Sequence, residues 1–196
     1  MIRAPWVAGV GGGVGTSTVA AAVGGRDRGV FTGRGVDVLV CRSTGESLIR
    51  ATRAAPCVAA DGLGPPVLAV SHDARTGLSR PTAARLRLVE PHAAAVVLLP
   101  FVPRWREVAS PLDEARDLLT RSPTGLPRPL RDYAAAIGRL AAAITASPRF
   151  HRAEGSSSDP TPRITALSPL SSPVSAASSA SSGLSRPISG APTWTP

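Results

Sequence analysis

The chain has 196 residues, of which 43% are hydrophobic and 18% are charged, a length and composition typical of one globular domain with a tail. Two enzyme domains of ordinary size are excluded. The formal net charge of +9 does not indicate a nucleic-acid partner, because all the basic residues are arginines scattered along the sequence, as a high-GC coding bias produces.

Apolar runs and helical periodicities alternate along the first three quarters of the chain. Short apolar runs, bounded by turn residues, predict strands over residues 6–10, 36–41, 66–70 and 94–99. Helical signals follow at 16–18, 46–55, 81–90 and 110–119, and from 130 until Ser147 and Pro148. This alternation predicts an α/β fold with a compact, mostly parallel sheet of about four or five strands and flanking helices.

The composition changes near residue 152. Residues 152–196 are rich in serine and proline and poor in large apolar side chains. Such a segment cannot bury enough surface to offset the entropy lost on ordering. We therefore predict an α/β domain over residues 1–151 and a disordered tail over residues 152–196.

A glycine-rich segment connects the first predicted strand to the first helix. Backbone N–H groups in such a loop converge on one point, and together with the helix dipole they bind phosphate. Glycine lets an anion approach the backbone and permits positive φ. The segment predicts a phosphate site, with a tight packing turn as the alternative. Its candidate binding residues are Gly11, Gly12, Gly13, Val14, Gly15, Thr16, Ser17 and Thr18.

This loop resembles the deviant P-loop of MinD/ParA-type ATPases, which reads lysine, two glycines, any residue, glycine, lysine, then Ser/Thr. The matching residues are Gly12, Gly13, Val14, Gly15, Ser17 and Thr18. The segments 37–42 and 98–103 resemble a late strand and a loop of that fold. The acidic magnesium-coordinating strands of the family are missing or much reduced.

The resemblance implies ATP or another nucleotide as ligand, with Mg²⁺ near Ser17. However, Gly11 and Thr16 occupy the positions of the family's two lysines, and the sequence contains no lysine at all. Cationic groups at the transferring phosphate normally supply much of the transition-state stabilisation. We therefore expect binding without efficient hydrolysis, and any phosphate contacts must come from arginine or backbone.

Two further candidates follow predicted strands. Asp73 is a possible Mg²⁺ ligand, with a solvated turn carboxylate as the alternative. Arg104, Trp105 and Arg106 follow the strand at 94–99, at the edge where open α/β sheets bind ligands. An indole face suits a base and a guanidinium suits phosphate, whereas a packed surface tryptophan beside solvated arginines is the alternative.

Two other functions fit the sequence. Gly9, Gly11 and Gly15, with Arg42 facing a 2′-phosphate, would suit an NADP-type dinucleotide module, although Val14 occupies the third glycine position of that motif. A pseudo-ATPase module that contacts a protein partner, with a vestigial loop, explains the lost lysines. Our main prediction is a nucleotide- or phosphate-binding domain in a regulatory or scaffolding role.

The cysteines and apolar segments predict a cytoplasmic protein. Cys41 and Cys57 form no CxxC pair and lie beside apolar residues, so we expect buried free thiols and neither a disulfide framework nor a metal site. Glycines 11–13 interrupt any signal-peptide apolar region. The best apolar run, 93–99, ends at Pro100 and is too short to span a membrane.

Overall fold

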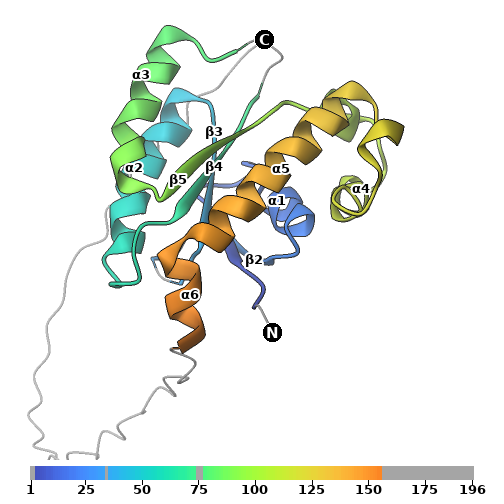
Figure 1. Ribbon diagram of the computed structural model, residues 1–196. Coiled ribbons are helices and arrows are strands. Elements are labelled where there is room, and N and C mark those ends of the chain that lie inside the picture. The colour runs from blue at the N-terminus through green and yellow to red at the C-terminus, as the bar shows by residue number, and fades with distance from the viewer. Residues whose placement is uncertain (1–2, 34, 74–76, 156–196) are drawn as a thin grey trace, which may run out of the picture. The chain divides into compact units, whose positions relative to one another are not determined.

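The structure is a computed structural model that describes residues 3–33, 35–73 and 77–155. It is an α/β fold with a five-stranded, all-parallel sheet flanked by helices (Figure 1). The strands are β1 (Trp6–Gly9), β2 (Arg26–Val30), β3 (Val38–Arg42), β4 (Val67–Ser71) and β5 (Ala95–Leu99). Their order in the sheet is β2-β1-β3-β4-β5, which confirms the predicted fold class.

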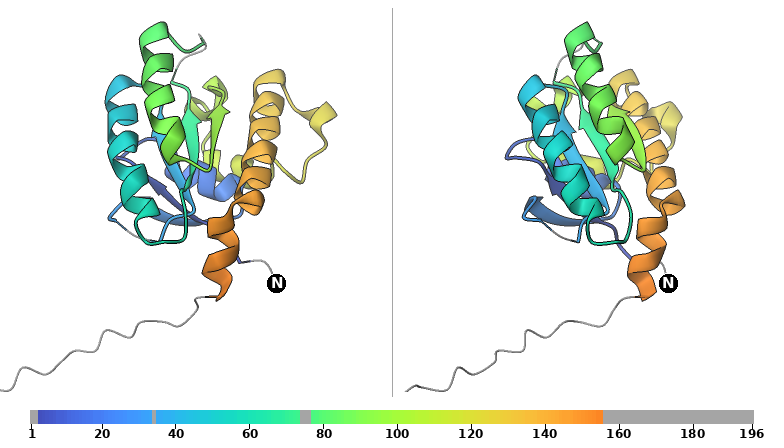
Figure 2. Two further views of the ribbon diagram at one scale, coloured as in Figure 1. Left: turned by 60° about the vertical axis from the view of Figure 1, so that its left-hand side comes forward. Right: turned by 90° about the vertical axis from the view of Figure 1, so that its left-hand side faces the viewer.

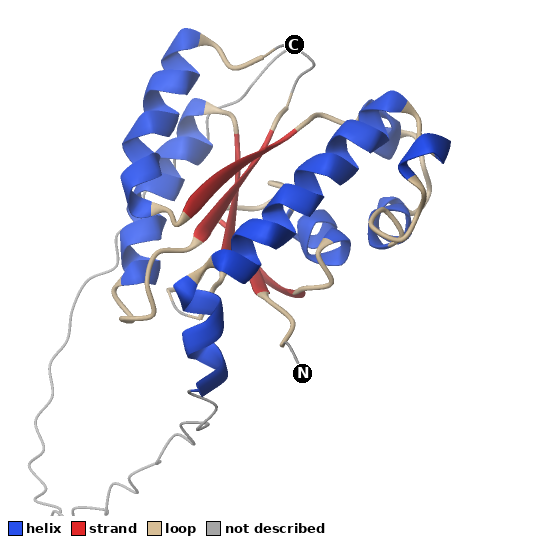
Figure 3. Cartoon of the chain, in the orientation of Figure 1, coloured by secondary structure: helices blue, strands red, loops and turns tan. Residues whose placement is uncertain are grey.

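Helices cover both faces of the sheet (Figures 1, 2 and 3). They are α1 (Thr16–Ala22), α2 (Gly45–Ala59), α3 (Arg80–Val89), α4 (Pro111–Arg116), α5 (Arg128–Ala146) and α6 (Pro148–Gly155). Helices α2 and α3 pack on one face, and α1 and α5 pack on the other, where α4 lies against α1. No described helix is long and apolar enough to cross a membrane.

The central strands were predictable because both of their faces are covered. Along β3, the side chains of Val38 and Val40 enter the core on the α1 and α5 side, while Leu39 and Cys41 enter the core under α2 and α3. All four are fully buried. A strand buried on both faces reads as a continuous apolar run, which is the signal in the sequence.

Strand β2 is the one that the sequence did not locate. All five of its residues are exposed, and it pairs with β1 at the edge of the sheet. The guanidinium groups of Arg26 and Arg28 lie 5.0 Å and 3.9 Å from the ring centroid of Trp6. The N–H of Gly29, where φ is +66°, donates to Asp27 Oδ1 at 2.7 Å. Charged side chains and an irregular backbone are typical of a protected edge strand.

The last helix follows α5 directly. Ser147 ends α5 as predicted, but Pro148 begins α6 at a position where its missing N–H costs nothing. Helix α6 runs to Gly155, past the predicted domain end at residue 151. The remainder of the predicted tail, residues 156–196, lies outside the described residues.

A buried arginine fixes α6 to the end of α2 and to the segments that precede β3 and β4. Arg149 is 1% exposed, and its Nη2 lies 2.5 Å from Asp61 Oδ2. Its other N–H groups donate to Asp61 Oδ1 at 2.8 Å, to the carbonyls of Val58 and Gly64 at 3.2 Å and 2.9 Å, and to the carbonyl of Val36. Burial alone would raise the pKa of Asp61, but hydrogen bonds from Arg149 and Leu63 and the charge of Arg149 outweigh it. The pKa of Asp61 therefore lies below its ordinary value.

The two cysteines differ in exposure, so the prediction of two buried thiols is wrong for Cys57. Cys41 is buried in β3, and burial raises the pKa of its thiol to about 12. Cys57 is exposed on α2, where its Sγ donates to the carbonyl of Arg53 at 3.3 Å. Its apolar neighbours in sequence lie on other faces of the same helix.

We expect a thiol-specific disulfide reagent at pH 8 to modify one cysteine per native chain rapidly, because only the thiolate reacts and Cys41 is both inaccessible and protonated. Absorbance of the released thiolate measures the rate. Cys57→Ser should remove the rapid phase, and denaturant should reveal the second thiol. Two equally rapid thiols in the native protein would contradict this assignment.

Candidate functional site

The candidate site lies at the carboxyl edge of the sheet. From β1 the chain continues to β2 on one side, whereas β3, on the other side of β1, leads on to β4 and β5. The boundary between β1 and β3 is therefore a topological switch point, outside which open α/β sheets form their ligand crevice. The glycine loop follows β1 at this boundary, and Val10 N donates to the carbonyl of Val40 in β3 at 2.9 Å.

Close packing fixes the start of the glycine loop. A Cβ on Gly9 would lie 2.6 Å from Val14 Cγ2 and would collide with Thr16 Oγ1. Thr16 is buried, so the residue at the P-loop lysine position lies against β1. The packing at Gly9 also accounts for one of the glycines on which the dinucleotide interpretation depends. Further along, Gly13 and Gly15 have φ of +70° and +95°, a backbone conformation that favours glycine.

The structure brings the glycine loop and Trp105 together at one cavity. A cavity of about 200 Å³ lies between the loop and the segments that follow β3, β4 and β5. Its lining includes Gly13, Val14, Gly15, Thr18, Arg42, Ser71, His72, Asp73, Phe101, Trp105, Arg106 and Tyr133. We call it the Trp105 cavity. It combines loop backbone, two arginines and aromatic side chains.

Trp105 is partly buried and has a packing role in addition to lining this cavity. Its ring meets that of Tyr133 edge to face, with centroids 4.5 Å apart and an interplanar angle of 81°. Within the described part of the chain, its buried Nε1 has no hydrogen-bond partner. Burial raises the pKa of Tyr133. Trp105 therefore packs against Tyr133 and also lines the cavity, as a ligand-binding tryptophan would.

Only one of the two arginines that flank Trp105 lines the Trp105 cavity. Arg104 Nε pairs with Glu114 Oε1 at 3.0 Å, and Arg104 is absent from the lining of the Trp105 cavity. Arg106 lines it instead, with its guanidinium 5.0 Å from the ring centroid of Phe101. Both arginines belong to the short 3-10 helix Pro103–Arg106, and a sequence pattern does not reveal which one lines the cavity.

A second cavity, of about 410 Å³, lies on the α2 side of the same loop. Its lining residues are Val10, Gly11, Gly12, Gly13, Val14, Arg42, Thr44, Glu46, Ser47 and Arg50. We call it the arginine cavity. Gly13, Val14 and Arg42 line both cavities, so the two adjoin across the glycine loop.

The two predicted Mg²⁺ ligands lie in different places. Asp73 lines the Trp105 cavity and accepts a hydrogen bond from Ser43 Oγ at 3.0 Å. Ser17 is exposed and lines another hollow, together with Leu112 and Arg116. Over residues 3–33, 35–73 and 77–155, no three His, Cys, Asp or Glu side chains gather in a way that could hold a metal ion.

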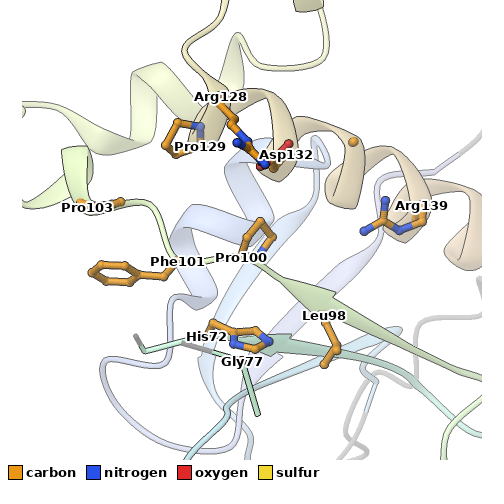
Figure 4. A pocket seen from close by; sticks show the side chains of 11 residues that line it. His72, Gly77, Leu98, Pro100, Phe101, Pro103, Arg128, Pro129, Asp132 and Arg139 are labelled. Atoms are coloured by element: carbon orange, nitrogen blue, oxygen red, sulfur yellow. The ribbon is translucent and has the colours of Figure 1, made fainter. Parts of the chain in front are cut away.

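A third cavity, of about 980 Å³, lies between α5 and the carboxyl end of β5 (Figure 4). It adjoins the Trp105 cavity through His72, Pro100 and Phe101. Arg128 and Asp132 lie side by side on α5, with Nε and Oδ2 3.9 Å apart. No part of the glycine loop lines this cavity, so the two cavities beside the loop remain the candidate site.

Sequence reasoning missed Arg50 and the aromatic partner Tyr133. The sequence did contain a signal for Arg50. It lies one helical turn after Glu46, in the predicted helix that follows the strand ending at Arg42. The side chains reach the loop from other elements, which a local pattern does not show.

Comparisons of the chain with protein-family models, curated protein sequences and solved structures found no match.

Proposed function

We propose that this α/β domain binds a nucleotide or a related phosphorylated ligand at the glycine loop, without hydrolysing it efficiently, in a regulatory or scaffolding role. The observation that carries the proposal is the Trp105 cavity, where loop backbone, Arg42 and Arg106 adjoin an indole ring. Backbone N–H groups and guanidinium groups suit phosphate, and an aromatic face suits a base.

Weak hydrolysis follows from the groups beside the loop. Thr16 occupies the position of the P-loop lysine and is buried against Gly9. Asp73 is engaged with Ser43, and Ser17 lies in another hollow. The resemblance to MinD/ParA-type ATPases, a cytoplasmic location and a protein partner that responds to the bound ligand belong to this same proposal.

Calorimetric titration of the full-length chain with ATP, ADP, GTP and NADP, with and without Mg²⁺, tests it. We expect saturable binding of at least one nucleotide. Gly13→Ala should weaken that binding by roughly tenfold or more, because alanine is strained at φ of +70° and the loop backbone must shift. Phosphate release should stay at the level of a protein-free control.

Gly24→Ala is the matched control. Gly24 is exposed and has φ of +64°, with open space around its Cβ position, but it lies at the end of α1, outside both loop cavities. The Gly24→Ala substitution should therefore cause the same backbone strain as Gly13→Ala but leave the affinity for the nucleotide unchanged. If no nucleotide binds at millimolar concentration, the loop is a packing turn, and the pseudo-ATPase interaction module becomes the better account.

A further inference from the structure

We propose that Arg42 and Arg50 supply the positive charge that the glycine loop itself lacks, and that together they bind the terminal phosphate of the ligand in the arginine cavity. This inference rests on the proposed function and adds the residues and the ligand class. It replaces the two missing loop lysines with two guanidinium groups from neighbouring elements.

The guanidinium of Arg50 occupies the space that the Cβ of any larger residue at position 11 would need. A Cβ built on Gly11 would be 2.8 Å from Arg50 Nη1. Glu46 Oε1 accepts from Arg50 Nη2 at 2.6 Å, which leaves Nη1 directed at the loop. Glycine at this position makes room for a guanidinium that arrives from α2. A side chain at position 11 and the guanidinium of Arg50 would compete for the same space, so glycine there allows the cation to come from α2 instead.

Arg42 approaches the same loop from the end of β3. Its Nη2 lies 3.8 Å from the position that a Cβ on Gly13 would take. Its backbone N–H donates to Ser47 Oγ at 2.8 Å, which fixes the strand end against the first turn of α2. Its guanidinium forms no ion pair with any other residue that the structure describes.

The charge balance of the arginine cavity favours an anion. Two guanidinium groups face one carboxylate, that of Glu46, and the loop adds backbone rather than side chains. An arginine presents its N–H donors as a planar fork that matches two phosphate oxygens, so a guanidinium can bind phosphate without a lysine. Both arginine side chains are exposed, so a ligand can reach them.

The shape of the site indicates an extended ligand. Because Arg42, Gly13 and Val14 line both cavities, a ligand that crosses the loop can place its terminal phosphate at the arginines and its ring near Trp105. A nucleoside di- or triphosphate has this form. The single phosphate of a nucleoside monophosphate cannot extend across the loop as a di- or triphosphate chain does. The affinity for a monophosphate should therefore depend less on Arg50.

Calorimetric titration with ATP, AMP and inorganic tripolyphosphate can test the assignment in full-length Arg42→Gln, Arg50→Gln and Glu46→Gln chains. We expect each arginine variant to bind ATP and tripolyphosphate with an affinity about tenfold or more lower than that of the wild type. The Arg50→Gln substitution should lower the affinity for AMP less than the affinity for ATP. Glu46→Gln should bind ATP more tightly, because it removes the competing carboxylate. Circular dichroism should show an unchanged fold in all three.

Arg53→Gln is the matched control, because Arg53 is an exposed arginine on the same helix but lines neither cavity. Its affinity for ATP should equal that of the wild type. If the wild-type chain binds ATP and both arginine variants bind it as well as this control, the arginine assignment is overturned and the proposed function stands. Weaker binding in Glu46→Gln would also overturn it. If the wild-type chain binds none of these probes, the arginine assignment is overturned, and the proposed function fails with it only when ADP, GTP and NADP do not bind either.

Discussion

Replacing Arg149 with methionine should lower the free energy of unfolding by about 3–5 kcal/mol, because it removes a buried donor and each buried acceptor left without a partner costs about 1–3 kcal/mol. Arg149 is 1% exposed and bonds both carboxylate oxygens of Asp61. The substitution also deprives three backbone carbonyls of a donor, those of Val36, Val58 and Gly64. Urea unfolding followed by circular dichroism measures the loss.

Arg131→Met is the control, because Arg131 is exposed on α5 and its replacement should change stability by no more than about 0.5 kcal/mol. The destabilisation in Arg149→Met should also depend on pH. The pKa of Asp61 is lower in the folded than in the unfolded chain, so this carboxylate adds stability above its unfolded pKa of about 3.9. That stability disappears as pH falls through the folded value, and the difference between wild type and variant should shrink accordingly. Equal stability of the two chains at neutral pH would show that Arg149 is dispensable.

Gly9→Ala should destabilise the domain by about 2–3 kcal/mol through overpacking at the start of the glycine loop. The new Cβ would lie 2.6 Å from Val14 Cγ2 and 3.1 Å from the carbonyl oxygen of Gly11, and would also collide with Thr16 Oγ1. Val14 and Thr16 are both buried, so neither can move aside without disturbing the core. Thermal unfolding of the purified chains measures the effect.

Gly12→Ala provides the comparison within the same loop. Gly12 is exposed, and its Cβ position has no atom within 4 Å, so its stability should stay within about 0.5 kcal/mol of the wild type. A Gly9→Ala chain as stable as Gly12→Ala would mean that the loop rearranges freely. The fixed geometry on which both proposals depend would then be lost.

The sequence predicted those parts of the fold that have a strong local signal. Strands β3 and β4 are apolar on both faces, and α5 carries an apolar stripe, so their burial is visible in the pattern of residues. Strand β2 has no such pattern because all its residues are exposed and its pairing to β1 uses backbone alone. Helix α6 depends on Arg149, whose partners lie far away in the sequence.

The candidate site was predictable to a similar extent. Glycine spacing located the loop, and the end of the predicted strand located Trp105 at the same edge of the sheet, but only the structure shows that the two line one cavity. The arginines were harder to assign, because a long side chain can reach a cavity even when its own backbone does not line that cavity. Arg104 faces Glu114 and Arg106 faces the loop, although they are two residues apart in one short helix.

The bonds of Arg149 have a consequence for how the domain is made. They join residues 113 positions apart at Val36 and 88 positions apart at Asp61. Contacts between distant parts of a sequence form late, since a long loop must close before they contribute. A nascent chain that has already supplied all five strands still lacks the side chain that satisfies the Asp61 carboxylate and these carbonyls. The domain therefore becomes fully stable only when synthesis has passed residue 149.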